Sequence, residues 1–245
     1  MSIEILARAA DNVLARREMK RRGVDFATPR VARVLRKAHL LGGVNVGLRT
    51  KSWDVLRTLE LLNQRVDKKA PILDLGAHTS EVLLGLHKLG FSDLTGIDLN
   101  PEVAQMPGGE SIKYVTGDLM QTPFSHETFG AVTAISVLEH GFSAARMFGE
   151  VSRILKKGGY FVGSTDYWPR KIDTSNIVVY GTDWTIFSRD EMLSFVEEAA
   201  QWQLSPVGPI HLEAAEPATR WLGKKYTFAW FAFQKTGSET GRRVL

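Results

Sequence analysis

The chain has no cysteine among its 245 residues. Disulfide bonds, thiolate zinc sites, iron–sulfur clusters and cysteine nucleophiles are therefore excluded, and the absence fits a reducing cytoplasm. No apolar run approaches the roughly 20 residues that a membrane-spanning helix needs. The first 22 residues include Glu4, Asp11 and Glu18, whereas signal and transit peptides avoid acids. We therefore expect a cytoplasmic protein with no transmembrane segment.

The charge of the chain is unevenly distributed. Residues 1–40 hold ten lysines and arginines against four acids, a net charge of +6, while the other 205 residues sum to −2. Such a basic surface fits an acidic partner, for example nucleic acid or an anionic membrane surface, but solvated helix faces also look like this. Phe26 is the one aromatic residue of this segment, which disfavours nucleic acid because bases stack on aromatic side chains.

Helical periodicity dominates the first 66 residues. A first helix is predicted from one apolar stripe, Ile3, Leu6, Ala10, Val13 and Leu14. A second helix is predicted to begin with Thr28 as its N-cap and to end at Gly42–Gly43, and Ser52 is predicted to cap a third. We interpret residues 1–50 as a basic helical N-terminal extension and residues 51–245 as the main domain.

From Pro71 onward, short apolar runs alternate with helical segments. Strands are predicted over 72–75, 94–99, 112–116, 131–137 and 160–164, and helices over 80–89 and 144–155. This alternation is typical of an α/β fold, a doubly wound parallel sheet with helices on both faces. A helix over 189–200 and two strands near 202–207 and 226–234 follow, and these strands are expected to form an antiparallel hairpin at the sheet edge.

Three acids lie where predicted strands end. Asp74 and Asp98 end the first two strands, and Asp118 follows the third. Ligands of open α/β sheets bind at the carboxyl ends of the strands, and Asp98 stands 22 positions after Gly76, about where a carboxylate binds the ribose hydroxyls of a nucleotide.

The loop after the first strand argues against a dinucleotide. It has only the first glycine, Gly76, of the G-x-G-x-x-G pattern that cradles a pyrophosphate. Glu81 stands where the phosphates would lie and would repel them. A cationic nucleoside without phosphates is favoured instead.

Five stretches resemble the class I S-adenosylmethionine-dependent methyltransferases, type 11-like: ILDLGAHTSEV, LTGIDLNP, YVTGDLMQTPF, FGAVTAISVLEHG and RILKKGGYFVGSTDYW. The resemblance covers residues 50–235 and implies a Rossmann-like seven-stranded sheet with the last strand antiparallel. It also implies S-adenosylmethionine as the cofactor. Within the last stretch, STDYW resembles bacterial enzymes of polysaccharide and glycoconjugate biosynthesis.

The resemblance also implies roles for the cofactor-binding residues. The methionine end is assigned to Asp74, Gly76, Ala77 and the neighbouring His78, and the ribose to Asp98. Adenine is assigned to Leu99, Asp118 and Leu119, and the place beside the sulfonium to Ser136. His78 and Ser80 stand where the family has glycines, so either the loop path differs or cofactor binding is weakened.

Candidate catalytic residues follow the fourth and fifth strands. His140 is a candidate general base or a wall of the cofactor pocket, and Asp166 is a candidate base or a partner of His140. Candidate acceptor contacts are Lys51, Tyr167, Trp168 and Trp184, and ordinary packing is the alternative for the aromatic ones. No histidines have the short spacing of a zinc site, so no metal is expected.

Two long connections, 166–187 and 208–225, are predicted to build the acceptor pocket. The function that these observations favour is methyl transfer from S-adenosylmethionine to a small-molecule or glycan hydroxyl. Two alternatives stay open, an RNA methyltransferase that uses the basic N-terminal helices and a non-catalytic scaffold with an eroded cofactor loop.

Overall fold

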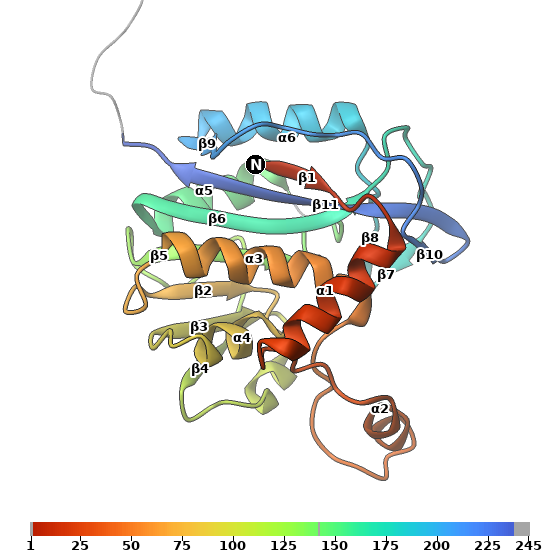
Figure 1. Ribbon diagram of the computed structural model, residues 1–245. Coiled ribbons are helices and arrows are strands. Elements are labelled where there is room, and N and C mark those ends of the chain that lie inside the picture. The colour runs from red at the N-terminus through yellow and green to blue at the C-terminus, as the bar shows by residue number, and fades with distance from the viewer. Residues whose placement is uncertain (1, 142, 238–245) are drawn as a thin grey trace, which may run out of the picture.

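A computed structural model describes residues 2–141 and 143–237. The described part forms a nine-stranded sheet with helices on both faces and a separate two-stranded hairpin (Figure 1). The strands of the large sheet are β1 (Ile3–Ile5), β2 (Ile72–Leu75), β3 (Leu94–Asp98), β4 (Ile112–Thr116), β5 (Phe129–Ile135), β6 (Leu155–Tyr167), β9 (Leu204–Pro206), β10 (Thr219–Trp221) and β11 (Lys224–Lys235). The small hairpin consists of β7 (Val178–Val179) and β8 (Thr182–Asp183). The helices are α1 (Ala9–Arg21), α2 (Arg30–Lys37), α3 (Ser52–Arg65), α4 (Val82–Lys88), α5 (Ala144–Ile154) and α6 (Arg189–Gln201), with short 3-10 helices at Arg49–Lys51 and Pro101–Gln105.

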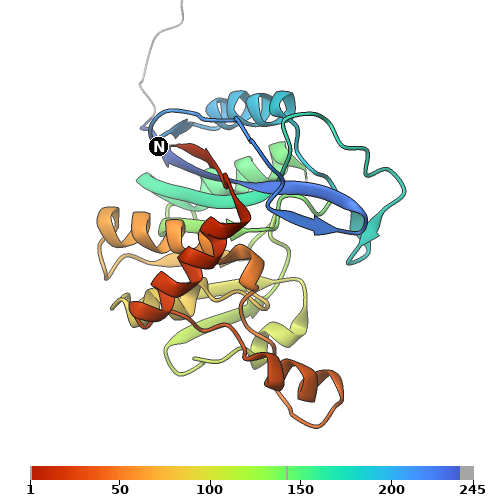
Figure 2. The ribbon, with the colours of Figure 1, turned by 45° about the vertical axis from the view of Figure 1, so that its right-hand side comes forward.

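The strand order confirms the predicted α/β fold. The order along the sheet is β1-β11-β6-β5-β2-β3-β4. The strands β2 to β6 pair in parallel, whereas β11 runs antiparallel to β6. All four residues of β2 are buried, as is typical of a parallel strand covered on both faces. Apolar residues of α1, α3 and α4 pack on one face of the sheet and those of α5 and α6 on the other (Figure 2).

Two short strands share the outer edge of β11. The strand β9 pairs with Phe233–Lys235, which confirms the predicted antiparallel hairpin, and β1 pairs with Ala229–Phe231. The predicted helix over Ile3 and Leu6 is therefore wrong. The edge of β11 presents unpaired backbone groups, and residues 3–5 satisfy them as a strand, so the N-terminus is part of the sheet.

The helix α1 buries a different face from the one predicted. Its buried residues are Ala15, Arg16 and Met19, whereas Val13 and Leu14 of the predicted apolar stripe are exposed. An arginine is on the buried face because its charge is paired inside the fold, which apolar periodicity does not reveal. Packing of α1 against α3 brings the basic N-terminal segment onto the body of the domain (Figure 1).

The helix α2 begins and ends differently from the prediction. Its N-cap is Pro29, and the Thr28 hydroxyl instead accepts a hydrogen bond from the Val46 N–H at 2.8 Å. The helix ends at Lys37, before Gly42–Gly43. Thr28 and Val46 thus close a stem from which α2 projects away from the sheet (Figures 1 and 2). No helix of the described residues is long and apolar enough to cross a membrane.

Candidate active site

The loop after β2 has a tightly constrained backbone. Gly76 has φ +73°, and a Cβ at this position would lie 2.5 Å from Cγ2 of Val137. The residue that takes the second left-handed conformation is Thr79, with φ +67°. Its carbonyl accepts a hydrogen bond from the Gly47 N–H at 2.8 Å. Neither His78 nor Ser80 has a positive φ. Their side chains therefore do not strain the backbone, although the family has glycines at these two positions.

Asp98 is held in one orientation at the end of β3. Its two carboxylate oxygens accept hydrogen bonds from the backbone N–H groups of His78 at 2.9 Å and Asn100 at 2.8 Å. Each oxygen has a further lone pair for a ribose hydroxyl. Leu99, next in the chain, exposes 67% of its surface, which gives an apolar face for a flat ring beside that carboxylate.

Asp74 has an unpaired oxygen inside the fold. Its Oδ1 accepts a hydrogen bond from the Thr133 hydroxyl at 2.6 Å, while its buried Oδ2 has no hydrogen-bond partner among the described residues. Burial raises the pKa of this carboxyl group to about 6. A buried carboxylate oxygen without a partner fits a cationic ligand group, because pairing with an ammonium restores the charged form.

Asp118 is more open than the other two acids. Its Oδ1 accepts from the Met120 N–H at 2.8 Å, and Arg146 lies 3.5 Å from its Oδ2. Leu119 is partly buried against the core. The predicted cofactor residues thus lie at or just after the ends of β2, β3 and β4, and Ser136 follows β5, so the parallel strands place them at one edge of the sheet.

Glu81 does not face the ligand side as a free charge. It is buried and accepts two hydrogen bonds from Arg16, at 2.6 and 2.8 Å. Arg16 also pairs with Asp25 at 2.8 Å. The argument that Glu81 repels phosphate is therefore wrong, because α1 supplies the neutralising charge.

A buried polar cluster lies around Lys51 (the Lys51 cluster: Lys51, Asp54, Glu139 and Asp166). The Nζ atom of Lys51 is 3.1 Å from Asp166, 3.7 Å from Asp54 and 3.8 Å from Glu139. It also lies 3.5 Å from the centre of the Phe228 ring. The four side chains come from three segments of the sequence, 51–54, 139 and 166, and are almost completely buried.

The carboxyl groups of the Lys51 cluster cannot all be charged against one ammonium. Burial and the nearby Asp166 raise the pKa of Glu139 to about 8, although Lys51 acts in the opposite direction. Burial also raises the pKa of Asp54 to about 6. Burial lowers the pKa of the Lys51 ammonium, but the surrounding carboxylates outweigh it and raise that pKa above its ordinary value. Glu139 is therefore the carboxyl group of the cluster whose pKa burial raises most clearly toward the neutral range.

His140 lies next to this cluster and is neutral near pH 7. Burial lowers its pKa below the ordinary value, and Asp166 only partly compensates. Its Nδ1 is buried without a hydrogen-bond partner among the described residues, and its ring meets Tyr180 edge-on at 5.3 Å between centroids. Ser136, with φ +60°, donates a hydrogen bond to Glu139. The cofactor loop adjoins this segment through the contact between Gly76 and Val137.

The aromatic residues predicted to contact the acceptor differ in how deeply they are buried. Tyr167 is fully buried in the main core, and its hydroxyl donates to the Leu212 carbonyl at 2.6 Å. Trp184 is also buried, and its Nε1 donates to Asp166 at 2.9 Å. Trp168 is only partly buried. The rings of Trp184 and Trp221 meet edge-on at 5.1 Å, which joins the two long connections on the predicted acceptor side.

Sequence reasoning missed Asp54 and Glu139 as parts of the site. Glu139 lies in the stretch FGAVTAISVLEHG, directly before the candidate base His140. Asp54 lies four residues before Thr58 and eight before Leu62 on the buried face of α3. An acid on an otherwise apolar helix face is a signal for a buried ion pair, because such a charge needs a partner.

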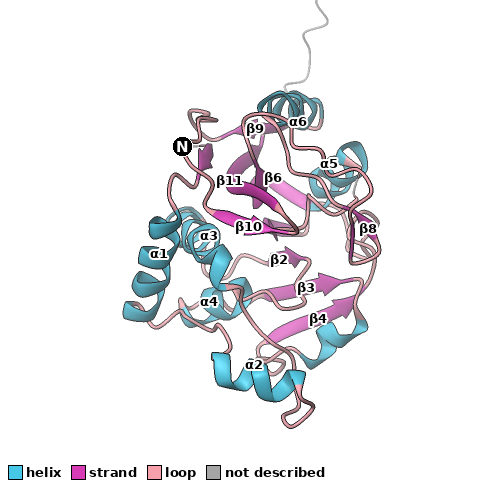
Figure 3. Ribbon diagram, turned by 90° about the vertical axis from the view of Figure 1, so that its right-hand side faces the viewer, coloured by secondary structure: helices cyan, strands magenta, loops and turns pink. Residues whose placement is uncertain are grey.

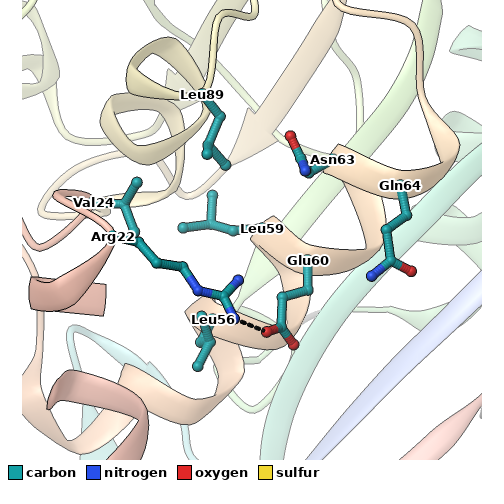
Figure 4. A pocket seen from close by; sticks show the side chains of 8 residues that line it. All are labelled: Arg22, Val24, Leu56, Leu59, Glu60, Asn63, Gln64 and Leu89. Carbon is teal, nitrogen blue, oxygen red and sulfur yellow. Dashed lines mark hydrogen bonds and ion pairs between the residues drawn. The ribbon is translucent and has the colours of Figure 1, made fainter. Parts of the chain in front are cut away.

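Two pockets lie elsewhere on the surface. The pocket in Figure 4, about 130 Å³, is lined by Arg22, Leu59 and Leu89 among others, and Arg22 pairs with Glu60 across it. A groove of about 370 Å³ runs along α3 beside Arg57 and Trp230. Neither includes a residue at the carboxyl ends of β2, β3 and β4. The strand ends, with their oriented and unpaired carboxylates, define the candidate site.

The sequence is similar to known methyltransferases. Residues 73–163 match the methyltransferase domain family Methyltransf_11. Over 98 residues, 37% of this chain, the sequence is 30% identical to the sterol 24-C-methyltransferase ERG6B of Gibberella zeae. The chain spans about a quarter (26%) of that relative's length.

The fold is shared with solved structures at low identity. Geranyl diphosphate C-methyltransferase from Streptomyces coelicolor A3(2), solved with S-adenosyl-L-homocysteine, is similar with a TM-score of 0.56 and 16% identity, over 74% of this chain and 78% of that one. The [4+2]-cyclase SpnF is similar with a TM-score of 0.53 and 18% identity, over 78% and 84%. The family match covers residues 73–163, and the solved structures show that the chain shares the Rossmann-like fold of S-adenosylmethionine-dependent methyltransferases.

Proposed function

We propose that this chain transfers a methyl group from S-adenosylmethionine to a small-molecule acceptor. The observation that carries the proposal is the adjacency of two sites. The loop after β2 is held by Asp98, which accepts from the His78 N–H, and Gly76 of the same loop lies against Val137, two residues before Glu139 of the Lys51 cluster and three before His140. One side suits the cofactor and the other suits proton transfer and acceptor positioning.

The cofactor side offers complementary groups. When bound, S-adenosylmethionine supplies an electrophilic methyl group. In this proposal Asp98 accepts from both ribose hydroxyls, the free Oδ2 of Asp74 pairs with the methionine ammonium, and Leu99 packs on adenine. Gly76, Ala77 and His78 form the floor of the methionine end, Asp118 and Leu119 border the adenine, and Ser136 lies beside the sulfonium.

His140 is the proposed general base. A neutral imidazole accepts a proton, and burial keeps His140 neutral near pH 7. Asp166 already accepts hydrogen bonds from Lys51 and Trp184, so we assign it to positioning rather than to proton transfer. Lys51 and Trp168 border the acceptor side, whereas Tyr167 and Trp184 are packed into the fold and act on the acceptor only through their neighbours.

The acceptor group is proposed as a hydroxyl of a small molecule or glycan. A hydroxyl loses a proton during methylation, which gives the neutral His140 a function. A carbon acceptor is the second candidate. It is supported by the names of the similar proteins, which methylate carbon in sterols and geranyl diphosphate.

The ion pairs of α1 weaken the case for RNA as a partner of that helix. The ion pairs of the described residues include Arg8 with Asp11, Arg16 with Glu81, and Arg21 and Arg22 with Glu18. These pairs offset part of the positive charge of α1, although Glu18 is shared by Arg21 and Arg22, so α1 presents fewer free cations to a phosphate backbone than its sequence suggests.

Calorimetric titration with S-adenosylhomocysteine tests the cofactor assignment, with NAD as the control ligand. Micromolar binding of the first and none of the second is the expected result. No binding of either ligand would favour a non-catalytic scaffold. A methyl-transfer screen over glycans, nucleotide sugars, sterols and prenyl diphosphates then separates hydroxyl from carbon acceptors.

A further inference from the structure

The helix α2 exposes an apolar face. No residue of α2 is buried. Val31 exposes 71% of its surface and Val34 66%, and Leu40 in the turn that follows exposes 75%. Leu35 and Leu41 are also exposed. Isolated exposed apolar residues are common, but five exposed apolar residues within eleven positions are an unusual concentration.

The polar face of α2 is turned toward its own stem. Arg33 donates hydrogen bonds to the carbonyls of Thr28, Val46 and Gly47. Arg36 donates to the Gly42 carbonyl and to Asn45. At 100° per residue, Val31, Val34 and Leu35 lie on the opposite side of the helix. The helix is thus bound to the protein by its polar side and exposes its apolar side to the surroundings.

This region also carries an unbalanced positive charge. Residues 26–53 contain six lysines and arginines and no acid. The ion pairs of the described residues include no arginine or lysine of α2, in contrast to the paired arginines of α1. Arg30 and Lys37 are exposed beside the apolar face.

We infer that α2 and the following Leu40–Leu41 turn dock on an anionic lipid bilayer. An apolar face flanked by unpaired cations is the pattern of helices that lie in a membrane interface, with the apolar side chains among the acyl chains and the cations at the headgroups. Charge complementarity selects this occupant, because a neutral apolar partner would leave Arg30 and Lys37 without a counter-charge.

Docking would bring the candidate site to the membrane. The stem of α2 rests on the cofactor loop through the hydrogen bond from Gly47 to Thr79. Figure 3 shows α2 below β2, β3 and β4 in the same view. If the proposed methyl transfer holds, and this step rests on it, the acceptor is an amphiphilic molecule presented at the bilayer surface.

Sedimentation of the full chain with lipid vesicles tests the docking surface. Vesicles of phosphatidylcholine alone are compared with vesicles that contain equal parts of phosphatidylcholine and phosphatidylglycerol. We expect binding to the anionic vesicles, at least about tenfold weaker binding to the neutral ones, and a decrease with added salt. Equal binding to both vesicle types, or binding to neither, would overturn the inference.

Variants separate the two contributions. Leu40→Glu and Val31→Glu should each weaken binding to anionic vesicles by roughly tenfold or more, because each removes a buried apolar group and adds repulsion. Lys37→Gln should weaken it by about fivefold and make it less sensitive to salt. Leu193→Glu is the matched control on α6, where an exposed leucine is changed to the same acid, and it should bind as the parent chain does.

Two further results would contradict the inference. Unchanged vesicle binding of Leu40→Glu would mean that α2 is not the docking surface. A concentration-dependent dimer in solution that Leu40→Glu abolishes would identify a second copy of the chain as the occupant. S-adenosylhomocysteine binding is measured on the same variants and stays unchanged if only docking is affected. Failure of the docking surface is thereby distinguished from failure of the proposed enzyme function.

Discussion

The proposed cofactor side and the proposed acceptor side of the site are built in different ways. On the cofactor side each acid follows its own strand and is oriented by nearby backbone, as Asp98 is by the N–H groups of His78 and Asn100. On the acceptor side the Lys51 cluster joins α3, the loop after β5 and the end of β6 through buried charges. The first arrangement follows from local sequence, whereas the second exists only when the whole chain is folded.

The largest expected effect concerns the stability of the acceptor side. Lys51→Met removes the one ammonium among three buried carboxyl groups, and loss of a partner in a buried ion pair costs about 3–5 kcal/mol of the free energy of unfolding. Chemical denaturation measures it. Lys171→Met is the control, because its pair with Glu191 is half exposed and should be worth less than about 1 kcal/mol. Equal losses in the free energy of unfolding for the two variants would contradict a special role for the buried Lys51 cluster.

The next effect separates chemistry from cofactor binding. His140→Ala should slow turnover by about 100-fold or more if His140 is the general base, with S-adenosylhomocysteine affinity unchanged in calorimetry. The exposed His126→Ala serves as the control. Near-normal turnover of His140→Ala would make His140 a wall of the cofactor pocket rather than a base.

A smaller effect is expected on the cofactor side. Asp98→Ala should weaken S-adenosylhomocysteine binding by about 1–3 kcal/mol, because charge-assisted hydrogen bonds to the ribose are lost. Asp93→Ala at the other end of β3 is the matched control and is exposed. If both variants bind equally well, Asp98 does not hold the ribose.

The last prediction is that the free energy of unfolding depends on pH through Glu139. Its pKa rises from 4.5 to about 8 on folding, chiefly through burial. The folded state then binds more protons than the unfolded state between these values. Its contribution is therefore fully present below pH 4.5 and decreases as the pH rises toward 8, by at most about 1.4 kcal/mol per unit. Denaturation of the parent chain and of Glu139→Gln across this range measures the slope, which the variant should lack. Parallel curves would contradict the protonated Glu139.

The sequence was informative where chemistry and periodicity are local. Strands of buried apolar residues ending in Asp74 and Asp98 indicated the sheet edge, and the order of five short stretches indicated the cofactor. It was misleading for residues 1–50. Apolar spacing does not show that Arg16 is buried in an ion pair with Glu81, or that Ile3–Ile5 pairs with the edge of β11.

By itself, then, the sequence determined the α/β class, the parallel order of alternating strands and helices, and the acids at the strand ends. These follow from hydrophobic periodicity and from side chains adjacent in the chain. Only the tertiary structure decided that Lys51, Asp54, Glu139 and Asp166 share one buried volume, and that Arg16 of α1 is paired inside the fold while α2 is left exposed and basic. The pairing of charges across more than a hundred residues depends on distances in space, and no local pattern encodes those distances.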